Sequence, residues 1–166
     1  MKRFISRYLP EEFFEKGAVR YAFFLGLVYL LLLITQLFTY EDFPAVIRTW
    51  SLPGGEVIVG LLVVIVPLCE LFSLPFLFSL PMRNQLVTLS QYATLAAAIL
   101  WLIISLWLTM TGTIAESGFF GATLSLPAGI WMLVYSLLLL AGALTVLYEF
   151  RRLGHQRNSL STQANR

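Results

Sequence analysis

Long apolar runs separated by short polar segments dominate the chain. Four runs are about 20 residues long or longer and carry few charges; they cover residues 19–40, 56–80, 86–110 and 128–148. Because an α-helix rises about 1.5 Å per residue, some 20 residues cross the roughly 30 Å hydrocarbon layer of a bilayer. The pattern therefore predicts an all-α, polytopic membrane protein in which four transmembrane helices form a bundle.

Polar segments flank these runs and set the expected domain organisation. Residues 1–18 mix charged and aromatic side chains, which is typical of a segment lying in the cytoplasmic membrane interface. A partly ordered tail is the alternative, because Pro10 would interrupt a single helix there. The four spans then form one domain over residues 19–150, and residues 151–166 form a polar tail that we expect to be disordered.

The connectors differ in length and composition. Residues 41–55 contain acidic, aromatic and turn-forming side chains, residues 81–85 form a very short turn, and residues 111–126 form a loop rich in Gly, Ser and Thr. Pro67 and Pro75 fall inside the second span. Because proline removes a backbone donor and obstructs the carbonyl one turn earlier, we expect that helix to kink or break toward its end.

Basic residues are distributed unevenly between the two ends of the predicted spans. The two tails and the second turn hold Lys2, Arg3, Arg7, Lys16, Arg20, Arg83, Arg151, Arg152, Arg157 and Arg166. Arg48 alone falls in the opposite connectors. Because Lys and Arg in short loops stay on the cytoplasmic side, both termini are predicted to be cytoplasmic, in a bacterial inner (plasma) membrane.

The composition restricts the chemistry that the chain can perform. With 58% hydrophobic and 12% charged residues and a net charge of +2, it lacks the basic face that a nucleic-acid partner requires. Cys69 is the only cysteine, which excludes a dithiol pair and a cysteine cluster for a metal. His155 is the only histidine and falls in the polar tail, so no span offers a histidine ligand to a haem, which argues against a haem cytochrome. The expected partners are the lipid bilayer and other membrane or exported protein subunits. We expect no metal and no cofactor, with a quinone left open.

One acidic residue, Glu70, lies deep in a span, fourteen residues after Glu56 and so roughly 21 Å along the helix. A carboxylate at that depth is costly unless it is protonated or paired, and an intramembrane Glu marks a candidate functional site. Counting residues inward from the helix ends places several hydrogen-bonding side chains near this level: Tyr29, Gln91, Tyr92, Thr94, Tyr135 and Ser136. This predicted polar site either holds the helices together or handles a proton or ligand, and the residues favour the structural role.

The loop before the last span contains Ser117-Gly118-Phe119-Phe120-Gly121. Together with Glu70 in the second span and the tight basic turn at residues 81–85, this order of features resembles the four-helix membrane proteins of the MauE and DoxX-like group. In the MauE branch the loop resembles Cys-Gly-Cys-Phe-Gly, so Ser117 and Phe119 stand at the positions of its thiols. Thiol–disulfide exchange needs two thiols, so the resemblance implies a divergent member without that chemistry. It also implies a role in the assembly or redox support of exported enzymes.

Two functional hypotheses follow. The first is a membrane subunit or assembly factor, not an enzyme, that binds its partners through helix faces, the N-terminal segment and a docking loop with Phe119 and Phe120 exposed. A loop that tucks into the bilayer interface is the alternative. The second is a small transporter or quinone-linked redox subunit that uses Glu70 as a proton site, with aromatic residues around an apolar cavity: Tyr29, Tyr92, Trp101 and Trp131. A polar cavity reaching Glu70 would favour the second hypothesis, and a packed bundle would favour the first.

Overall fold

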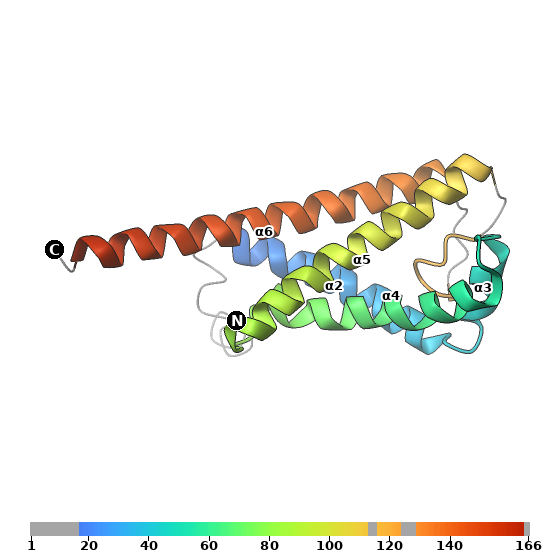
Figure 1. Cartoon of the computed structure of the whole chain (residues 1–166), viewed down its shortest axis with the longest axis horizontal. Helices are drawn as coiled ribbons and strands as arrows, with labels where there is room; N and C mark the ends of the chain where they lie inside the picture. Colours follow the sequence, from blue (N-terminus) through green and yellow to red (C-terminus); the bar gives the residue numbers. More distant parts are fainter. Residues whose placement is uncertain (1–16, 113–115, 124–128, 165–166) are drawn as a thin grey trace, which may run out of the picture.

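The computed structural model of the chain describes residues 17–112, 116–123 and 129–164, with side chains described as far as Arg152. Within these ranges the chain is helical, and Figure 1 shows the order of its elements. The helices are α2 (Gly17–Phe38), α3 (Phe43–Thr49), α4 (Gly55–Leu77), α5 (Asn84–Thr111) and α6 (Ile130–Ala164).

Four of these helices are long and apolar enough to cross a membrane. The candidate spans are Gly17–Phe38, Gly55–Leu77, Asn84–Thr111 and Ile130–Arg152. They begin and end within a few residues of the predicted runs, so the prediction of a multi-pass helical membrane protein is confirmed. The predicted interfacial segment, residues 1–18, lies outside the described residues except for its last two.

The long helices pack in a ring. α2 contacts α4, α4 contacts α5, α5 contacts α6, and α6 returns to contact α2. Buried small residues, among them Ala22, Ala97 and Ala143, line the interior and allow the helix backbones to approach closely. Large apolar side chains are exposed around the outside, as expected of a bundle surrounded by lipid.

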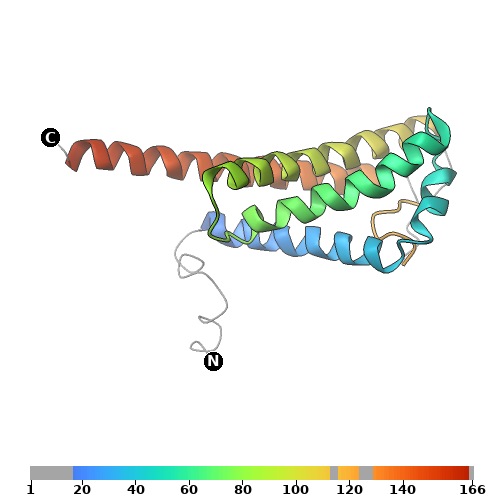
Figure 2. The same ribbon diagram turned by 60° about the horizontal axis from the view of Figure 1, so that its bottom comes forward.

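The two ends of the bundle differ. At one end lie the start of α2, the turn between α4 and α5, and the part of α6 that carries the exposed Arg151 and Arg152 (Figure 1). We call this the basic end. At the other end, α3 and residues 116–123 lie across the helix termini, and we call this the loop end (Figure 2).

The connector at residues 41–55 contains a helix that was not predicted. α3 places Pro44 in its first turn, where the missing N–H of proline is not needed. Phe43, Val46 and Ile47 are buried, and their i, i+3, i+4 spacing gives the short helix one apolar face, which packs on α4. The predicted connector is therefore corrected to a helix that covers the loop end of the bundle.

The C-terminal tail is also helical where the sequence predicted no helix. α6 continues through residues 153–164, which we expected to be disordered, and projects past the bundle at the basic end (Figure 2). Thirty-five residues extend about 52 Å, well beyond the roughly 30 Å hydrocarbon layer. Extending an existing helix avoids the unfavourable nucleation step, which explains why a polar sequence can continue the span.

Helix α4 remains continuous through both of its prolines. Near Pro75 the hydroxyl of Ser90, on α5, accepts a hydrogen bond from the Phe76 N–H at 3.0 Å and donates to the Phe72 carbonyl at 2.6 Å. A side chain from the neighbouring helix thus stands between a donor and an acceptor that an undisturbed helix would pair directly. Of the predicted kink or break, the break is absent: α4 runs without interruption to Leu77, two residues after Pro75.

Substituting Ser90→Ala is expected to lower the free energy of unfolding by about 1–2 kcal/mol, because the buried Phe76 N–H would lose its acceptor. The measurement is reversible unfolding in mixed micelles by titration with sodium dodecyl sulfate. Thr88→Ala is the matched control, since Thr88 is exposed on the same helix and donates only to the Asn84 carbonyl. Equal stability of the two variants would show that the Ser90 bridge contributes nothing.

Candidate functional site

A buried polar centre joins three helices. Glu70 of α4 is 0% exposed, and its Oε1 accepts hydrogen bonds from Trp101 Nε1 of α5 at 2.8 Å and from Gln36 Nε2 of α2 at 3.1 Å. Gln36 and Trp101 are themselves buried. We call these three residues the polar centre. Both donors reach the same carboxyl oxygen, so the centre ties α2, α4 and α5 together near the loop end.

The loop between α5 and α6 completes this site. The carbonyl of Phe119 accepts a second hydrogen bond from Gln36 Nε2 at 3.2 Å. The Phe119 ring stacks on Trp101, with 4.3 Å between ring centroids, and meets the ring of Tyr135 of α6 edge-on at 6.5 Å. Through this one residue the loop contacts α2, α5 and α6.

The predicted exposed docking loop is therefore wrong for this chain. Phe119 is 3% exposed, Ser117 is also buried, and Phe120 is half-buried. The physical reason is that the amide of Gln36 has a second N–H, which needs an acceptor inside the bundle. The aromatic ring also packs between Trp101 of α5 and Tyr135 of α6.

Two glycines allow the loop to approach this closely. Gly118 and Gly121 both have left-handed backbone angles, with φ of +67° and +57°. A Cβ on Gly118 would lie 2.5 Å from Cζ2 of Trp50, and a Cβ on Gly121 would meet the Thr39 hydroxyl and lie 3.0 Å from Cα of Gln36. The two glycines of the sequence motif are thus required by the packing of the loop against α2 and α3.

Further hydrogen bonds hold the loop end closed. The Ala122 N–H donates to Thr39 Oγ1 at 2.9 Å, and the Trp50 indole donates to the Glu116 carbonyl at 2.8 Å. The Trp107 indole in turn donates to the Trp50 carbonyl at 3.3 Å. Trp50, which directly follows α3, is therefore hydrogen-bonded to both the loop and α5.

Most of the side chains predicted to surround Glu70 lie elsewhere. The Tyr29 hydroxyl is buried but donates to the Thr94 carbonyl at 2.9 Å. Tyr92 is 65% exposed, Tyr135 is 54% exposed, and Gln91 is half-buried. Of the two remaining predicted side chains, Thr94 Oγ1 donates to the carbonyl of Ser90, and Ser136 pairs with Ser105 at 2.6 Å between the two hydroxyl oxygens. The predicted hydrogen-bonded cluster is thus corrected to Glu70, Gln36 and Trp101.

The reason for this correction is the stagger of the helices. Glu70 lies fifteen residues after the start of α4 at Gly55, whereas its partner Gln36 lies two residues before the end of α2 at Phe38. α4 therefore begins well beyond the end of α2, and α3 fills the offset (Figure 2). The prediction counted depth from the cytoplasmic ends of the helices and assumed that these ends lie at one level. Glu70 is seven residues from that end of α4 at Leu77, whereas Gln36 is nineteen residues from that end of α2 at Gly17.

The polar centre retains two acceptor atoms without partners. Glu70 Oε2 and Gln36 Oε1 are buried and form no hydrogen bond with the described residues, and the same holds for Ser117 Oγ. The first two sit on side chains already joined by a hydrogen bond, so the centre can accept a further donor. No group of three or more His, Cys, Asp or Glu among the described residues could hold a metal ion.

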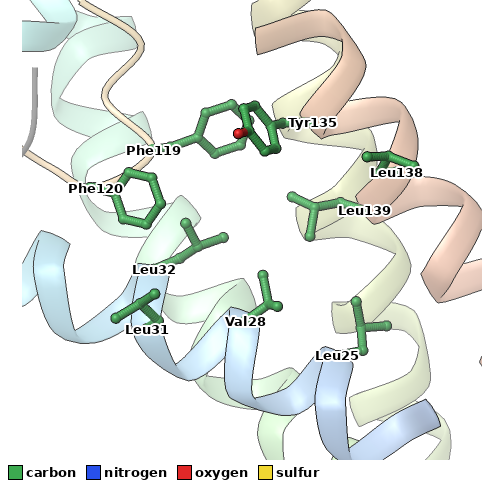
Figure 3. Close-up of a pocket in the computed structure, with 9 residues that line it drawn as sticks. All are labelled: Leu25, Val28, Leu31, Leu32, Phe119, Phe120, Tyr135, Leu138 and Leu139. Atoms are coloured by element: carbon green, nitrogen blue, oxygen red, sulfur yellow. The ribbon is translucent and has the colours of Figure 1, made fainter. Parts of the chain in front are cut away.

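A lateral pocket lies beside this centre but is separated from it. The pocket has a volume of about 380 Å³ and is lined by α2, α6 and the loop, including Leu32, Phe119, Tyr135 and Leu139 (Figure 3). Glu70 is not part of its lining. The four aromatic residues predicted to surround a cavity are also dispersed: Tyr29 and Trp101 are buried, whereas Tyr92 and Trp131 are exposed.

Comparisons with known proteins add no relative. No protein-family model, no curated protein sequence and no solved structure matches the chain.

Proposed function

We propose that the chain is a non-catalytic integral membrane subunit or assembly factor, of the MauE and DoxX-like kind, that supports a membrane-associated or exported redox enzyme. The observation that carries this proposal is the closed polar centre. Glu70 is 0% exposed and receives its hydrogen bonds from two neighbouring helices, which is the arrangement of a structural link.

The alternative function, a small transporter or quinone-linked redox subunit that uses Glu70 as a proton site, requires a path to the carboxyl group. The pocket of about 380 Å³ ends at Phe119, and two further pockets, of about 210 and 480 Å³, are also lined without Glu70. The unpartnered Glu70 Oε2 favours the alternative, since this carboxyl oxygen can take up a proton, and the unpartnered Gln36 Oε1 can accept a hydrogen bond from a further donor. The packing around them supports the structural role more strongly.

The burial of Phe119 moves the proposed partner contacts away from the loop. Exposed aliphatic side chains on the long helices offer faces to other membrane proteins. The projecting residues 153–164 of α6 offer a polar helix to a partner outside the membrane at the basic end (Figure 1). We place the partner on these surfaces.

The charge distribution supports the proposed orientation in a bacterial inner membrane. At the basic end Arg20, Arg83, Arg151 and Arg152 are exposed. At the loop end the exposed Arg48 is held 2.8 Å from the Glu56 carboxylate, and this hydrogen bond raises the pKa of the Arg48 guanidinium. Arg48 therefore remains charged but is offset by an acid, so the excess of positive charge lies at the basic end, which we assign to the cytoplasm.

Glu70→Gln tests the proposal, because glutamine keeps the Oε1 acceptor but cannot carry a proton or a charge. We expect its unfolding free energy to stay within about 1 kcal/mol of the unsubstituted chain, and the same partner to co-purify in mild detergent. Glu70→Leu, which removes the acceptor, is expected to lose about 2 kcal/mol and to release that partner.

Two results would contradict the proposal. If the native chain purifies without any other protein after chemical cross-linking in membranes, it is not a subunit or an assembly factor. If Glu70→Gln folds and keeps its partner but loses uptake or electron transfer to quinone, Glu70 has a titrating role and the alternative function holds.

A further inference from the structure

An apolar groove follows the seam between α2 and α6. The pocket of about 380 Å³ shares Leu25, Val28 and Leu138 with a second pocket of about 480 Å³, which extends toward Tyr21 and Thr145 at the basic end. Shared lining residues make the two pockets successive sections of one elongated groove. Figure 3 shows the section next to the loop, with Phe119 and Tyr135 on one side of the opening and Leu25 on the other.

The groove is open to the lipid rather than to the interior of the bundle. Its floor includes the buried Leu32 and Leu139, whereas Leu31 and Leu138 on its rim are exposed. Because α2 and α6 contact each other along this seam, a helix about 10 Å wide cannot enter it. A single extended hydrocarbon chain is narrower than a helix and suits the apolar lining of both sections. The first section alone lies within the roughly 300–1,000 Å³ of ligand pockets.

Three arginines lie on α2 and α6 near the basic end of the groove, which we call its mouth. Tyr21 and Thr145 line its outer section; Arg20 precedes Tyr21, and Arg151 and Arg152 lie about two helical turns beyond Thr145. These three arginines are exposed, and none is in an ion pair within the described part of the chain. The half-buried Glu149 is the one acid on this stretch of α6, so the mouth keeps a positive excess. Basic sites between transmembrane helices at the cytoplasmic side bind anionic lipid headgroups.

We propose that this groove binds one acyl chain of an anionic phospholipid, with the headgroup held by Arg20, Arg151 and Arg152. The elongated apolar groove selects a hydrocarbon tail, and the charged mouth selects a negative headgroup. The proposal is independent of the function proposed above, because neither Glu70 nor a protein partner takes part in it.

The test uses the full chain, purified in mild detergent and mixed with phosphatidylglycerol or with phosphatidylcholine of identical acyl chains. Native mass spectrometry then counts the lipids retained on each chain. We expect one phosphatidylglycerol per chain, with phosphatidylcholine bound about tenfold more weakly or less.

Two glycines provide a matched pair of variants. Gly142 lines the groove, and a Cβ there would lie 3.3 Å from Leu25 Cδ1, so Gly142→Phe fills the groove. Gly60, also helical, has no atom within 4 Å of such a Cβ, so Gly60→Phe adds the same ring on another face. Phosphatidylglycerol retention should fall about tenfold in Gly142→Phe and remain unchanged in Gly60→Phe.

Several outcomes would overturn the proposal. Equal retention of both lipids removes the role of the arginines, and unchanged retention in Gly142→Phe removes the role of the groove. Bound prenyl quinone, or a dimer that only Gly142→Phe dissociates, would assign the groove to another occupant. Should Gly142→Phe fail to fold, the combined substitution of Arg20, Arg151 and Arg152 by Gln tests the proposal instead, because these side chains are exposed. Phosphatidylglycerol retention should fall in this variant and stay unchanged in the control Arg83→Gln, and equal retention in the two would overturn the proposal.

Discussion

Trp101→Ala is expected to destabilise the bundle by about 3 kcal/mol. The substitution removes the shorter of the two hydrogen bonds to Glu70, at 2.8 Å, and the ring on which Phe119 stacks. We choose the lower end of the range for tryptophan truncation, because a helix that separates within the bilayer remains in an apolar medium and gains little from the hydrophobic effect. What is lost is the packing, the hydrogen bond and the anchor of the loop.

Reversible unfolding in mixed micelles measures this loss of stability. Two further variants separate the contribution of the hydrogen bond from that of the packing. Trp101→Phe keeps a ring against Phe119 but removes the indole donor, so it should lose about 1–2 kcal/mol. Trp131→Ala deletes the same side chain from a site that is 70% exposed on α6, and we expect no more than about 0.5 kcal/mol. If Trp101→Ala were no more damaging than Trp131→Ala, the polar centre would not stabilise the bundle.

The positions of the four spans could be predicted because they depend only on local hydropathy. A run of apolar residues long enough to cross the bilayer must form a helix there, since no water is present to satisfy its backbone. The same logic fails for α3, because a seven-residue helix depends on burying Phe43, Val46 and Ile47 against another element. Local pattern alone cannot show that such a surface exists.

Glu70 could be predicted as the centre of the site, but its partners could not. An acidic residue deep in an apolar run can be recognised from the sequence however the helices are aligned. Its partners, in contrast, depend on how far α4 is shifted along α2. α3 lies between the two helices and accompanies that shift, and it was not predicted. Gln36 carried one usable signal, since it is a polar side chain in the apolar first span and its burial demands a partner.

Phe119 was assigned the opposite environment for a related reason. Aromatic residues between glycines in a loop suggest exposure when the chain is viewed as isolated elements. In the folded chain, the free N–H of Gln36 and the face of Trp101 attract the backbone and ring of Phe119 inward. The glycines on either side are then explained by close packing rather than by flexibility.

Gly121→Ala is expected to release this loop from the bundle and to lower the unfolding free energy by about 2–5 kcal/mol. The left-handed backbone, with φ of +57°, strains any residue that has a Cβ, and that Cβ would lie 3.0 Å from both the Gln36 Cα and the Thr35 carbonyl. These neighbours are backbone atoms of α2, which cannot move aside as a flexible side chain can. The loop must therefore move, and it carries the Phe119 carbonyl away from Gln36.

Gly112→Ala separates the two causes, because Gly112 has nearly the same φ, +62°, but nothing within 4 Å of the added Cβ. It should lose only the backbone contribution of about 1 kcal/mol, and the difference between the variants measures how strongly the loop is held against α2. Hydrogen exchange gives a second measure, because the Ala122 N–H donates to Thr39 of α2 and is hydrogen-bonded in this way only while the loop is in place. Faster exchange of the Ala122 amide in Gly121→Ala alone would show that the loop is held against α2 and closes the polar centre. Equal exchange and equal stability in the two variants would mean that the polar centre forms without the loop, and Phe119 would lose its place in the site.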